Sequence, residues 1–334
     1  MSDKKITDYD YLYLTSALRA KEPKKLTKDK IDRMLDAQNF EDAAKMLMEC
    51  GYADMSGMAA SALEKALSKH RKEVFEEIRQ LIPERSVLDA FCLKYDYHNA
   101  KVLIKAESAN VDGRYLLSDS GMVSADTLIT AYQAEDYEAL PKKLAESLEE
   151  ARSVLKRTEN AQLADFILDR AYFQEMKETA EKLYSPFLSD YVNLAIDGAN
   201  LRATVRTLRM GRDSEFLKNA LIEGGSIDTS KLLNAVANDE GFEALYLHTP
   251  FSQAAALGQE AVHGGRLTEF EKSCDNVLIN YFDGTKDISF GVAPVIAYIA
   301  GLENEITAAR MILSGKLLGV EPSLIRERLR DISA

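Results

Sequence analysis

The sequence has no tryptophan and few of the residues that interrupt helices. Only 17 glycines and 7 prolines occur among its 334 residues, whereas alanine, leucine, glutamate and lysine are abundant. This composition favours helix over sheet. Alternating β-branched runs bounded by turn residues, which would predict strands, are also missing. We therefore expect an all-α fold.

Clustered positive charge is missing as well. The formal net charge is -12, and the lysines and arginines are scattered among acidic residues. Binding to nucleic acid needs clustered cations that neutralise phosphates, so this pattern argues against a nucleic-acid partner. Hydrophobic residues make up 46% of the chain and charged residues 29%, as in a folded protein. The length allows two or three domains.

Cysteines and long apolar runs are few. Cys50, Cys92 and Cys274 lie far apart without a C-x-x-C pair, so we expect buried free thiols in a reducing compartment. The first residues lack the apolar core of a signal peptide. The longest apolar run, residues 291–302, is well short of the ~20 residues that span a bilayer. We expect a cytoplasmic chain without a membrane span, which leaves room for a membrane-embedded partner.

Catalytic motifs are missing too. The sequence contains no Walker-type phosphate loop, no G-x-G-x-x-G and no G-x-S-x-G. Glu260 and His263 have the Glu-x-x-His spacing of di-iron bundles, but only one copy exists and Gly264 with Gly265 interrupts the helix after it. We expect no catalytic, cofactor-binding or metal-binding residues. An enzyme hypothesis would rest on Glu260 and His263 with a bound metal.

The stretch from residue 291 to residue 330 gives the strongest helical signal. Its apolar side chains follow the three-and-four spacing of a helix with one buried face. They are Val292, Val295, Ile296, Ile299, Ile306, Ala309 and Leu313. We expect this helix to stop at Ser314 and Gly315, and a shorter helix to begin at Glu321 and Pro322.

A helix pair recurs three times along the chain. Each copy has a capping residue, an apolar helix and then an aromatic residue that opens a second helix. The spacing from cap to aromatic is nearly the same in the three copies: Thr27 with Phe40, Ser124 with Tyr137, and Asp228 with Phe242. Longer helices are expected to follow over residues 58–77, 140–183 and 251–270.

A second marker lies on the amphipathic helix that ends each unit, which we call the closing helix. It consists of an acid, then a residue three positions later, then a cation two positions after that. The copies are Asp96, Asn99 and Lys101; Asp197, Asn200 and Arg202; and Glu305, Ala308 and Arg310. The period of about a hundred residues is long enough for each unit to enclose its own core. We therefore predict three similar helical domains, 1–118, 119–222 and 223–334.

Three segments resemble a known family over the whole chain. They are the N-terminal helix with Tyr11, Tyr13, Ala17, Arg19 and Glu22; the following LTKDKIDRMLDAQNFEDAAKML; and the C-terminal PVIAYIAGLENEITAARMILSGKLLGVEPSLIRERL. Together they resemble the C subunit of the archaeal and bacterial V/A-type rotary ATPases, the counterpart of the d subunit of the eukaryotic V-type ATPase. Matching residue types in the C-terminal block are Glu305, Ile306, Arg310, Ile312, Gly315, Lys316 and Gly319. Ala308 departs from the family, which usually carries Asn there.

The resemblance implies three similar helical domains around a pseudo-threefold axis, forming a funnel. It implies a non-catalytic central-stalk subunit, peripheral on the cytoplasmic face of the membrane. Its partners would be the subunits of the membrane rotor ring and of the central shaft, with one copy of this chain in the hetero-oligomeric complex. The complex would couple ATP to the transport of protons or sodium ions, and no cofactor is implied for this subunit.

Glycine-rich joints follow the closing helices at the same place in each unit, and such joints mark turns and close approach of the backbone. We predict that these joints and their basic residues form part of the partner interface. The predicted interface residues are Arg114, Arg209, Arg212, Gly315 and Lys316. The alternative is a general helical scaffold that binds acidic or helical proteins outside any rotary complex.

Overall fold

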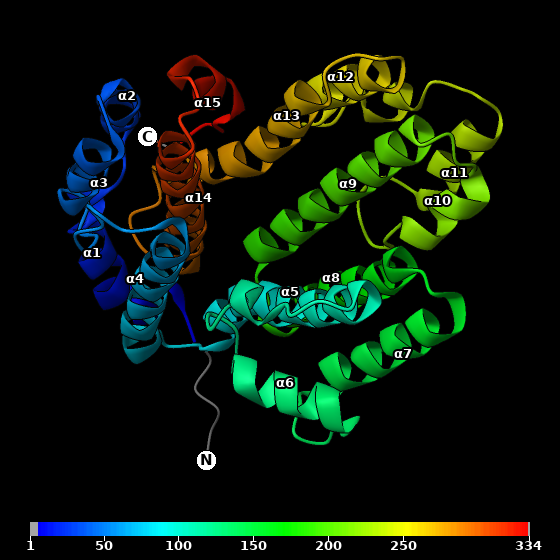
Figure 1. Ribbon diagram of the computed structural model, residues 1–334, viewed down its shortest axis with the longest axis horizontal. Coiled ribbons are helices and arrows are strands. Elements are labelled where there is room, and N and C mark those ends of the chain that lie inside the picture. Colours follow the sequence, from blue (N-terminus) through cyan, green and yellow to red (C-terminus); the bar gives the residue numbers. More distant parts are fainter. Residues whose placement is uncertain (1–5, 333–334) are drawn as a thin grey trace. The chain divides into compact units, whose positions relative to one another are not determined.

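The computed structural model describes residues 6–332, and over this range it contains helices and no strand (Figure 1). The predicted all-α fold class is confirmed. The chain forms two compact units, which are described separately. The terminal unit combines Met1–Leu88 with Lys272–Ala334, and the central unit comprises Asp89–Glu271. The prediction of three repeat domains stays a prediction.

The terminal unit is built around one long helix, α14 (Val292–Leu317), which contacts most of the other helices of this unit. Figure 1 shows it, in red-brown, among the blue N-terminal helices. The helices that contact it are α1 (Leu12–Arg19), α2 (Lys28–Asp36), α3 (Phe40–Met48), α4 (Ala60–Leu81) and α15 (Pro322–Arg328). Segments from opposite ends of the sequence therefore share one core.

The apolar face predicted for α14 is confirmed except at Val292, which is only partly buried, and the predicted end of the helix is wrong. Val295, Ile296, Ile299 and Ile306 are fully buried. The helix continues past Gly315 to Leu317, because the left-handed residue that ends it is Gly319, with φ +65°. The short helix α15 begins at Pro322 as expected.

The helices of the central unit pack against one another, some against their neighbours in the sequence and some against more distant helices. In it α8 contacts both α7 and α9, and α9 also contacts α12. Its helices are α6 (Ala125–Ala134), α7 (Lys142–Thr158), α8 (Ala161–Lys182), α9 (Pro186–Arg209), α10 (Ser214–Ala220), α11 (Thr229–Ala237) and α12 (Ser252–Val262). Two further helices, α5 (Ser86–Ala109) and α13 (Leu267–Asn280), have residues in both units.

The three predicted helix caps are confirmed. The side chains of Thr27, Ser124 and Asp228 accept backbone N–H bonds at the starts of α2, α6 and α11. The second helix of each predicted pair forms fully only once, as α3. Residues 137–140 form a turn before Pro141, and Phe242–Tyr246 is a 3-10 helix.

Two of the predicted long helices are each divided in two. Glu159 has φ +53° and separates α7 from α8, and Gly264 has φ +103° between α12 and α13. The three cysteines are buried thiols, as predicted. Between residues 6 and 332, no helix is both long enough and apolar enough to cross a bilayer.

Two glycines of α14 should respond oppositely to the same substitution. A Cβ at Gly301 meets no atom within 4 Å, whereas a Cβ at Gly315 would lie 2.6 Å from Cδ1 of the buried Ile325 on α15. Gly301→Ala should stabilise the protein by about 0.5–1 kcal/mol through helix propensity. Gly315→Ala should destabilise it by about 1–3 kcal/mol through overpacking. Urea unfolding of both variants measures the contrast, and equal shifts would contradict the packing role of Gly315.

Candidate functional site

The acid of each closing-helix marker makes the same hydrogen bond. On α5, α9 and α14 the carboxylate accepts the backbone N–H of the residue just before a helix cap, on α6, α11 and α2 respectively. The bonds are Val123 N to Asp96 Oδ1 at 2.9 Å, Ile227 N to Asp197 Oδ1 at 3.1 Å, and Leu26 N to Glu305 Oε2 at 3.1 Å. The repeat found in the sequence is therefore a repeated contact. In the third copy the bonded helix comes from the N-terminal part of the chain.

The cation five positions after each acid also has an equivalent role. Each one pairs with a carboxylate on a neighbouring long helix, α8, α13 or α4. The pairs are Lys101 with Asp169 at 2.7 Å, Arg202 with Glu271 at 3.0 Å, and Arg310 with Glu64 at 2.7 and 2.8 Å. Each closing helix thus makes one polar contact to the start of a capped helix and another to a long helix. The two contacts lie about one and a half turns apart on the closing helix.

The asparagines of the first two markers hold the segment after the closing helix. Asn99 accepts from Ser118 N and donates to Ser118 O, both at 2.8 Å, and Asn200 bonds Ile222 in the same way. Ala308 cannot make this pair of bonds. In the third copy Asn304 Nδ2 instead donates to the carbonyl oxygen of Asp331 at 2.7 Å.

Asn276 completes this replacement. Its Oδ1 accepts a hydrogen bond from Asp331 N at 3.0 Å. Both the backbone N–H and the backbone carbonyl group of Asp331 are therefore bound by side-chain amides. Asp331 follows Ala308 at nearly the same distance along the chain as Ile222 follows Asn200. Two other asparagines therefore supply, at nearly the same place, the bonds that Ala308 cannot make, and the sequence pattern did not reveal this.

Each of the three closing helices ends in a turn of the same kind. The predicted joints therefore lie at equivalent positions in the three repeats. A residue with positive φ follows each helix at the same spacing from the marker acid, and the next N–H bonds back to a carbonyl oxygen five positions earlier. The residues are Asn110, Gly211 and Gly319, and the bonds are Val111 to Ala106 at 3.0 Å, Arg212 to Thr207 at 3.0 Å and Val320 to Gly315 at 2.8 Å.

Two of the predicted interface residues bind backbone carbonyl groups within their own unit. The first is Arg209, whose Nη1 donates to the carbonyl oxygens of Ala261 and Gly265 at 3.0 and 3.1 Å, at the end of α12. Its guanidinium therefore stabilises a helix C-terminus, where carbonyl groups lack partners.

Lys316 has the same role at the end of α2. Its ammonium donates to the carbonyl oxygens of Leu35 and Ala37 at 3.0 and 2.6 Å. Gly315 lies inside α14 and faces α15, so it is a packing glycine and not a joint.

Arg114 and Arg212 are exposed like Arg209, but the structure does not bind them to the end of a helix as it binds Arg209. The side chain of Arg114 is 65% exposed and lies 3.8 Å from the Asp112 carboxylate. The guanidinium of Arg212 lies over the ring of Phe216, 5.5 Å from its centroid. The role of all five residues in partner contact stays a prediction, and Arg114 and Arg212 are the two exposed arginines of the set that do not cap a described helix.

Exposed apolar side chains at the helix-end turns were missed from the sequence. They are Val111 and Tyr115 after α5, Met210 after α9, and Leu318 and Leu324 after α14. Each lies a short way past the end of its closing helix, and Leu318 is 79% exposed. In the sequence, these residues could have been recognised as apolar side chains that come directly after the end of a predicted helix.

The alternative site at Glu260 and His263 is on the surface near the end of α12. The ring nitrogen Nε2 of His263 lies 3.4 Å from Gln259 Nε2. Across residues 6–332, histidine, cysteine and acidic side chains form no group of three or more that could hold a metal ion.

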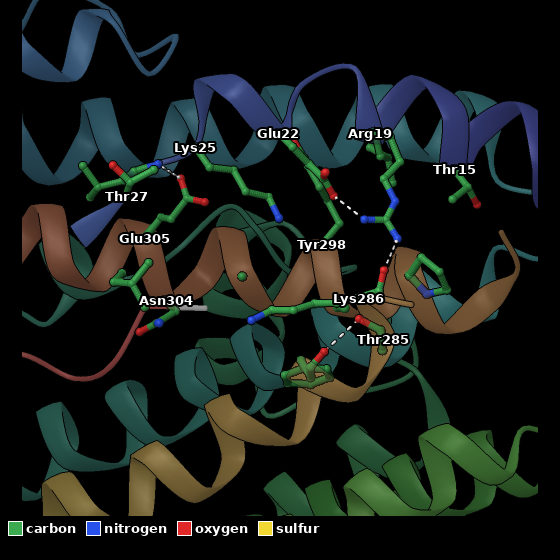
Figure 2. A pocket seen from close by; sticks show the side chains of 17 residues that line it. Thr15, Arg19, Glu22, Lys25, Thr27, Thr285, Lys286, Tyr298, Asn304 and Glu305 are labelled. Atoms are coloured by element: carbon green, nitrogen blue, oxygen red, sulfur yellow. Dashed lines mark hydrogen bonds and ion pairs between the residues drawn. The ribbon is translucent and has the colours of Figure 1, made fainter. Parts of the chain in front are cut away.

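Burial changes the acidity of two marker carboxyls. Burial raises the pKa of Glu305 to about 7, although the Leu26 N–H and the charges of Lys25 and Lys30 oppose the shift. Burial also raises the pKa of Asp96 to about 6, against the N–H bonds from Val123 and Met122. Figure 2 shows Glu305 on α14 beside Lys25 and Thr27.

Glu305→Gln should change how stability depends on pH. The pKa of Glu305 in the folded chain, about 7, lies above its ordinary 4.5, so its stabilising contribution is complete below pH 4.5 and is lost as pH rises through 7. Gln keeps an oxygen for Leu26 N–H and carries no buried charge. At pH 8 the variant should gain stability over wild type by on the order of 3 kcal/mol relative to pH 5.

Urea unfolding at both pH values measures this difference. The exposed Glu240→Gln is the matched control and should leave the pH dependence unchanged. Parallel pH profiles for Glu305→Gln and wild type would contradict the buried-carboxyl interpretation.

Comparisons with known proteins agree along the whole chain. A family model described as ATP synthase (C/AC39) subunit matches residues 14–328. The chain is 24% identical over 328 residues to the C subunit of the V-type sodium ATPase of Enterococcus hirae, covering 97% of this chain and 99% of the relative.

Two further relatives align over similar lengths. The C subunit of the V-type ATP synthase of Thermus thermophilus is 23% identical, with 96% of this chain and 98% of the relative covered. The C subunit of the A-type ATP synthase of Methanocaldococcus jannaschii is 24% identical, with 96% and 86% covered. Because the family model spans nearly all of the described helices, the chain belongs to the ATP synthase (C/AC39) subunit family.

Proposed function

We propose that this chain is the non-catalytic central-stalk subunit that couples the membrane rotor ring to the central shaft of a V/A-type ATPase. The observation that carries the proposal is the family match over residues 14–328. The subunit would be peripheral on the cytoplasmic face of the membrane, and ion transport would take place in its membrane partners.

The repeated contacts of the closing helices support a mechanical role. Each closing helix binds one helix through a carboxylate and another through an ion pair. A part that transmits torque must resist relative movement of its helices, and directional contacts between packed elements provide this resistance.

The threefold repetition suits a partner with rotational symmetry. We propose three similar domains, 1–118, 119–222 and 223–334, around a pseudo-threefold axis in a funnel. Equivalent turns at the ends of α5, α9 and α14 would present equivalent surfaces to a ring of identical subunits.

Co-purification tests the proposal. The tagged chain, recovered from detergent-solubilised membranes of its source, should bring down shaft subunits and the membrane ring in fixed proportion. Recovery of unrelated soluble proteins alone would instead support the general helical scaffold.

Reversing the charges of Arg114 and Arg212 should weaken this assembly. Arg114→Glu combined with Arg212→Glu should lower recovery of the ring or shaft several-fold near 0.15 M salt, because surface charge contacts act over about 8 Å there. As the salt concentration is raised, recovery with the wild-type chain should fall toward recovery with the variant.

The control is Lys69→Glu with Lys142→Glu, at lysines whose side chains are 78% and 86% exposed on α4 and α7. It changes the net charge equally and should leave recovery unchanged. Unaltered recovery and salt sensitivity in the arginine variant would remove these residues from the interface while leaving the family assignment intact.

A further inference from the structure

The third marker carboxylate has fewer hydrogen bonds than the other two. Asp96 and Asp197 each accept two consecutive backbone N–H groups. The donors are Met122 and Val123 for Asp96, at 3.1 and 2.9 Å, and Ser226 and Ile227 for Asp197, both at 3.1 Å. From residues 6–332, Glu305 accepts one backbone N–H, that of Leu26. Hydrogen bonds therefore stabilise ionised Glu305 through one donor where the other two carboxylates have two.

The third carboxylate is also packed less closely by the backbone. A Cβ at Gly121 would lie 2.1 Å from Asp96 Oδ1, and one at Gly225 would lie 2.2 Å from Asp197 Oδ1, so backbone atoms pack directly against both carboxylates. Glu305 is 7% exposed but lines two cavities, of about 170 and 280 Å³. Its carboxyl group is thus shielded from bulk solvent and loosely surrounded.

The chain that donates to Glu305 passes α14 between these two cavities. This crossing segment, residues 20–27, joins α1 to α2. Residues of η5 (Tyr281–Thr285) complete the first cavity, and residues of α4 complete the second. Lys25, Tyr298 and Glu305 line both cavities and so form the wall between them. Figure 2 shows these three residues where the segment passes α14.

The crossing segment has one apolar anchor. Leu26 is 1% exposed, and it is the one buried residue among residues 20–27. The polar contacts of the segment to neighbouring elements include the Lys21–Glu77 ion pair, the Lys25 ammonium at 5.3 Å from the ring centroid of Tyr298, and Cys50 Sγ at 3.9 Å from Lys25 O. A segment that buries so little apolar surface can open locally while the helices around it stay folded.

Titratable groups face Glu305 from each element packed against it. The charges of Lys25 and of Lys30 on α2 favour ionised Glu305 and oppose the effect of burial. Burial raises the pKa values of Cys50, Tyr52 and Tyr298, so these groups keep their protons near pH 7. Burial lowers the pKa of His70 on α4 below its ordinary 6.5. The other charged residues that line the two cavities are Arg19, Lys21, Glu22, Lys24, Glu73, Glu77 and Lys286.

We propose that the crossing segment is a pH-sensitive latch on α14, which opens when Glu305 loses its proton. In the closed state the carboxyl group is buried and accepts Leu26 N–H. In the open state water surrounds both groups, and the two cavities join along α14. The latch rests on contacts within the chain and does not depend on the rotary role.

The direction of the response follows from the burial of Glu305. Its pKa is about 7 in the closed state, above the ordinary 4.5 that it regains in water. Its contribution to closure is therefore complete below pH 4.5 and is lost as pH rises through 7. The ratio of open to closed latch should rise roughly 50-fold between pH 5 and pH 8.

Hydrogen exchange at the Leu26 amide measures the opening. The ¹⁵N-labelled, deuterated full chain is followed by NMR from pH 5 to pH 8, and the intrinsic exchange rate divided by the measured rate gives a protection factor. The protection factor of Leu26 should fall roughly 50-fold over this range. At pH 8 the amides of Ile299 and Ile306 should remain roughly 100-fold better protected than Leu26, because α14 stays folded when the latch opens.

Variants identify the group that titrates. Glu305→Gln keeps an acceptor for Leu26 N–H and should hold the protection factor constant within about threefold from pH 5 to pH 8. The exposed control Glu240→Gln should retain the full fall. Lys25→Met should extend the fall to higher pH by about half a pH unit, because it removes a charge that favours ionised Glu305. The exposed control Lys28→Met should leave the profile unchanged.

Three results would overturn the latch. The first is a Leu26 protection factor that does not change with pH in the wild-type chain. The second is a fall that persists in Glu305→Gln, which would assign it to another group such as His70. The third is equal protection of Leu26 and Ile306 at pH 8, which would mean that the segment opens only when α14 unfolds. The proposed function would stand in each case, because co-purification tests it separately.

Discussion

A buried carboxylate that binds the backbone before a helix cap is the contact on which the three closing helices depend. Burial removes water from the carboxylate and from the backbone N–H. The hydrogen bond between them lowers the free-energy cost of burying both groups. Asp96, Asp197 and Glu305 are all buried, and none is more than 7% exposed. The longer side chain of Glu305 reaches Leu26, which belongs to a segment far away in the sequence.

The sequence contained the repeat because this contact requires specific residue types at fixed spacing. Caps, acids and cations could be aligned without a structure, and the three caps and the helices after them were predicted correctly. Helix ends were predicted less well, since a residue with positive φ such as Glu159 carries no strong sequence signal. The predictions of a second helix near Tyr137 and near Phe242 were wrong, because a turn and a 3-10 helix form there instead.

The candidate site could be predicted only in part, because charge in a sequence does not reveal what it binds. Arg209 and Lys316 look like surface cations, yet each binds two carbonyl oxygens at a helix end. Exposed apolar residues such as Leu318 and Tyr115 follow the same turns and were overlooked. The bonds that Asn304 and Asn276 make to Asp331 became visible only when the three copies were compared in space, since Ala308 alone suggested no more than a missing amide.

The pairing of α14 with the N-terminal helices has a consequence for synthesis on the ribosome. The helices α2 and α3 emerge early, but α14, which buries their apolar faces, begins only at Val292. At roughly 5–20 residues per second, about 12–50 s pass before it is made. The central unit can meanwhile collect its contacts from neighbouring segments. The N-terminal helices must therefore keep their exposed apolar faces from aggregating until the final segment of the chain arrives, which makes them the part most in need of a chaperone.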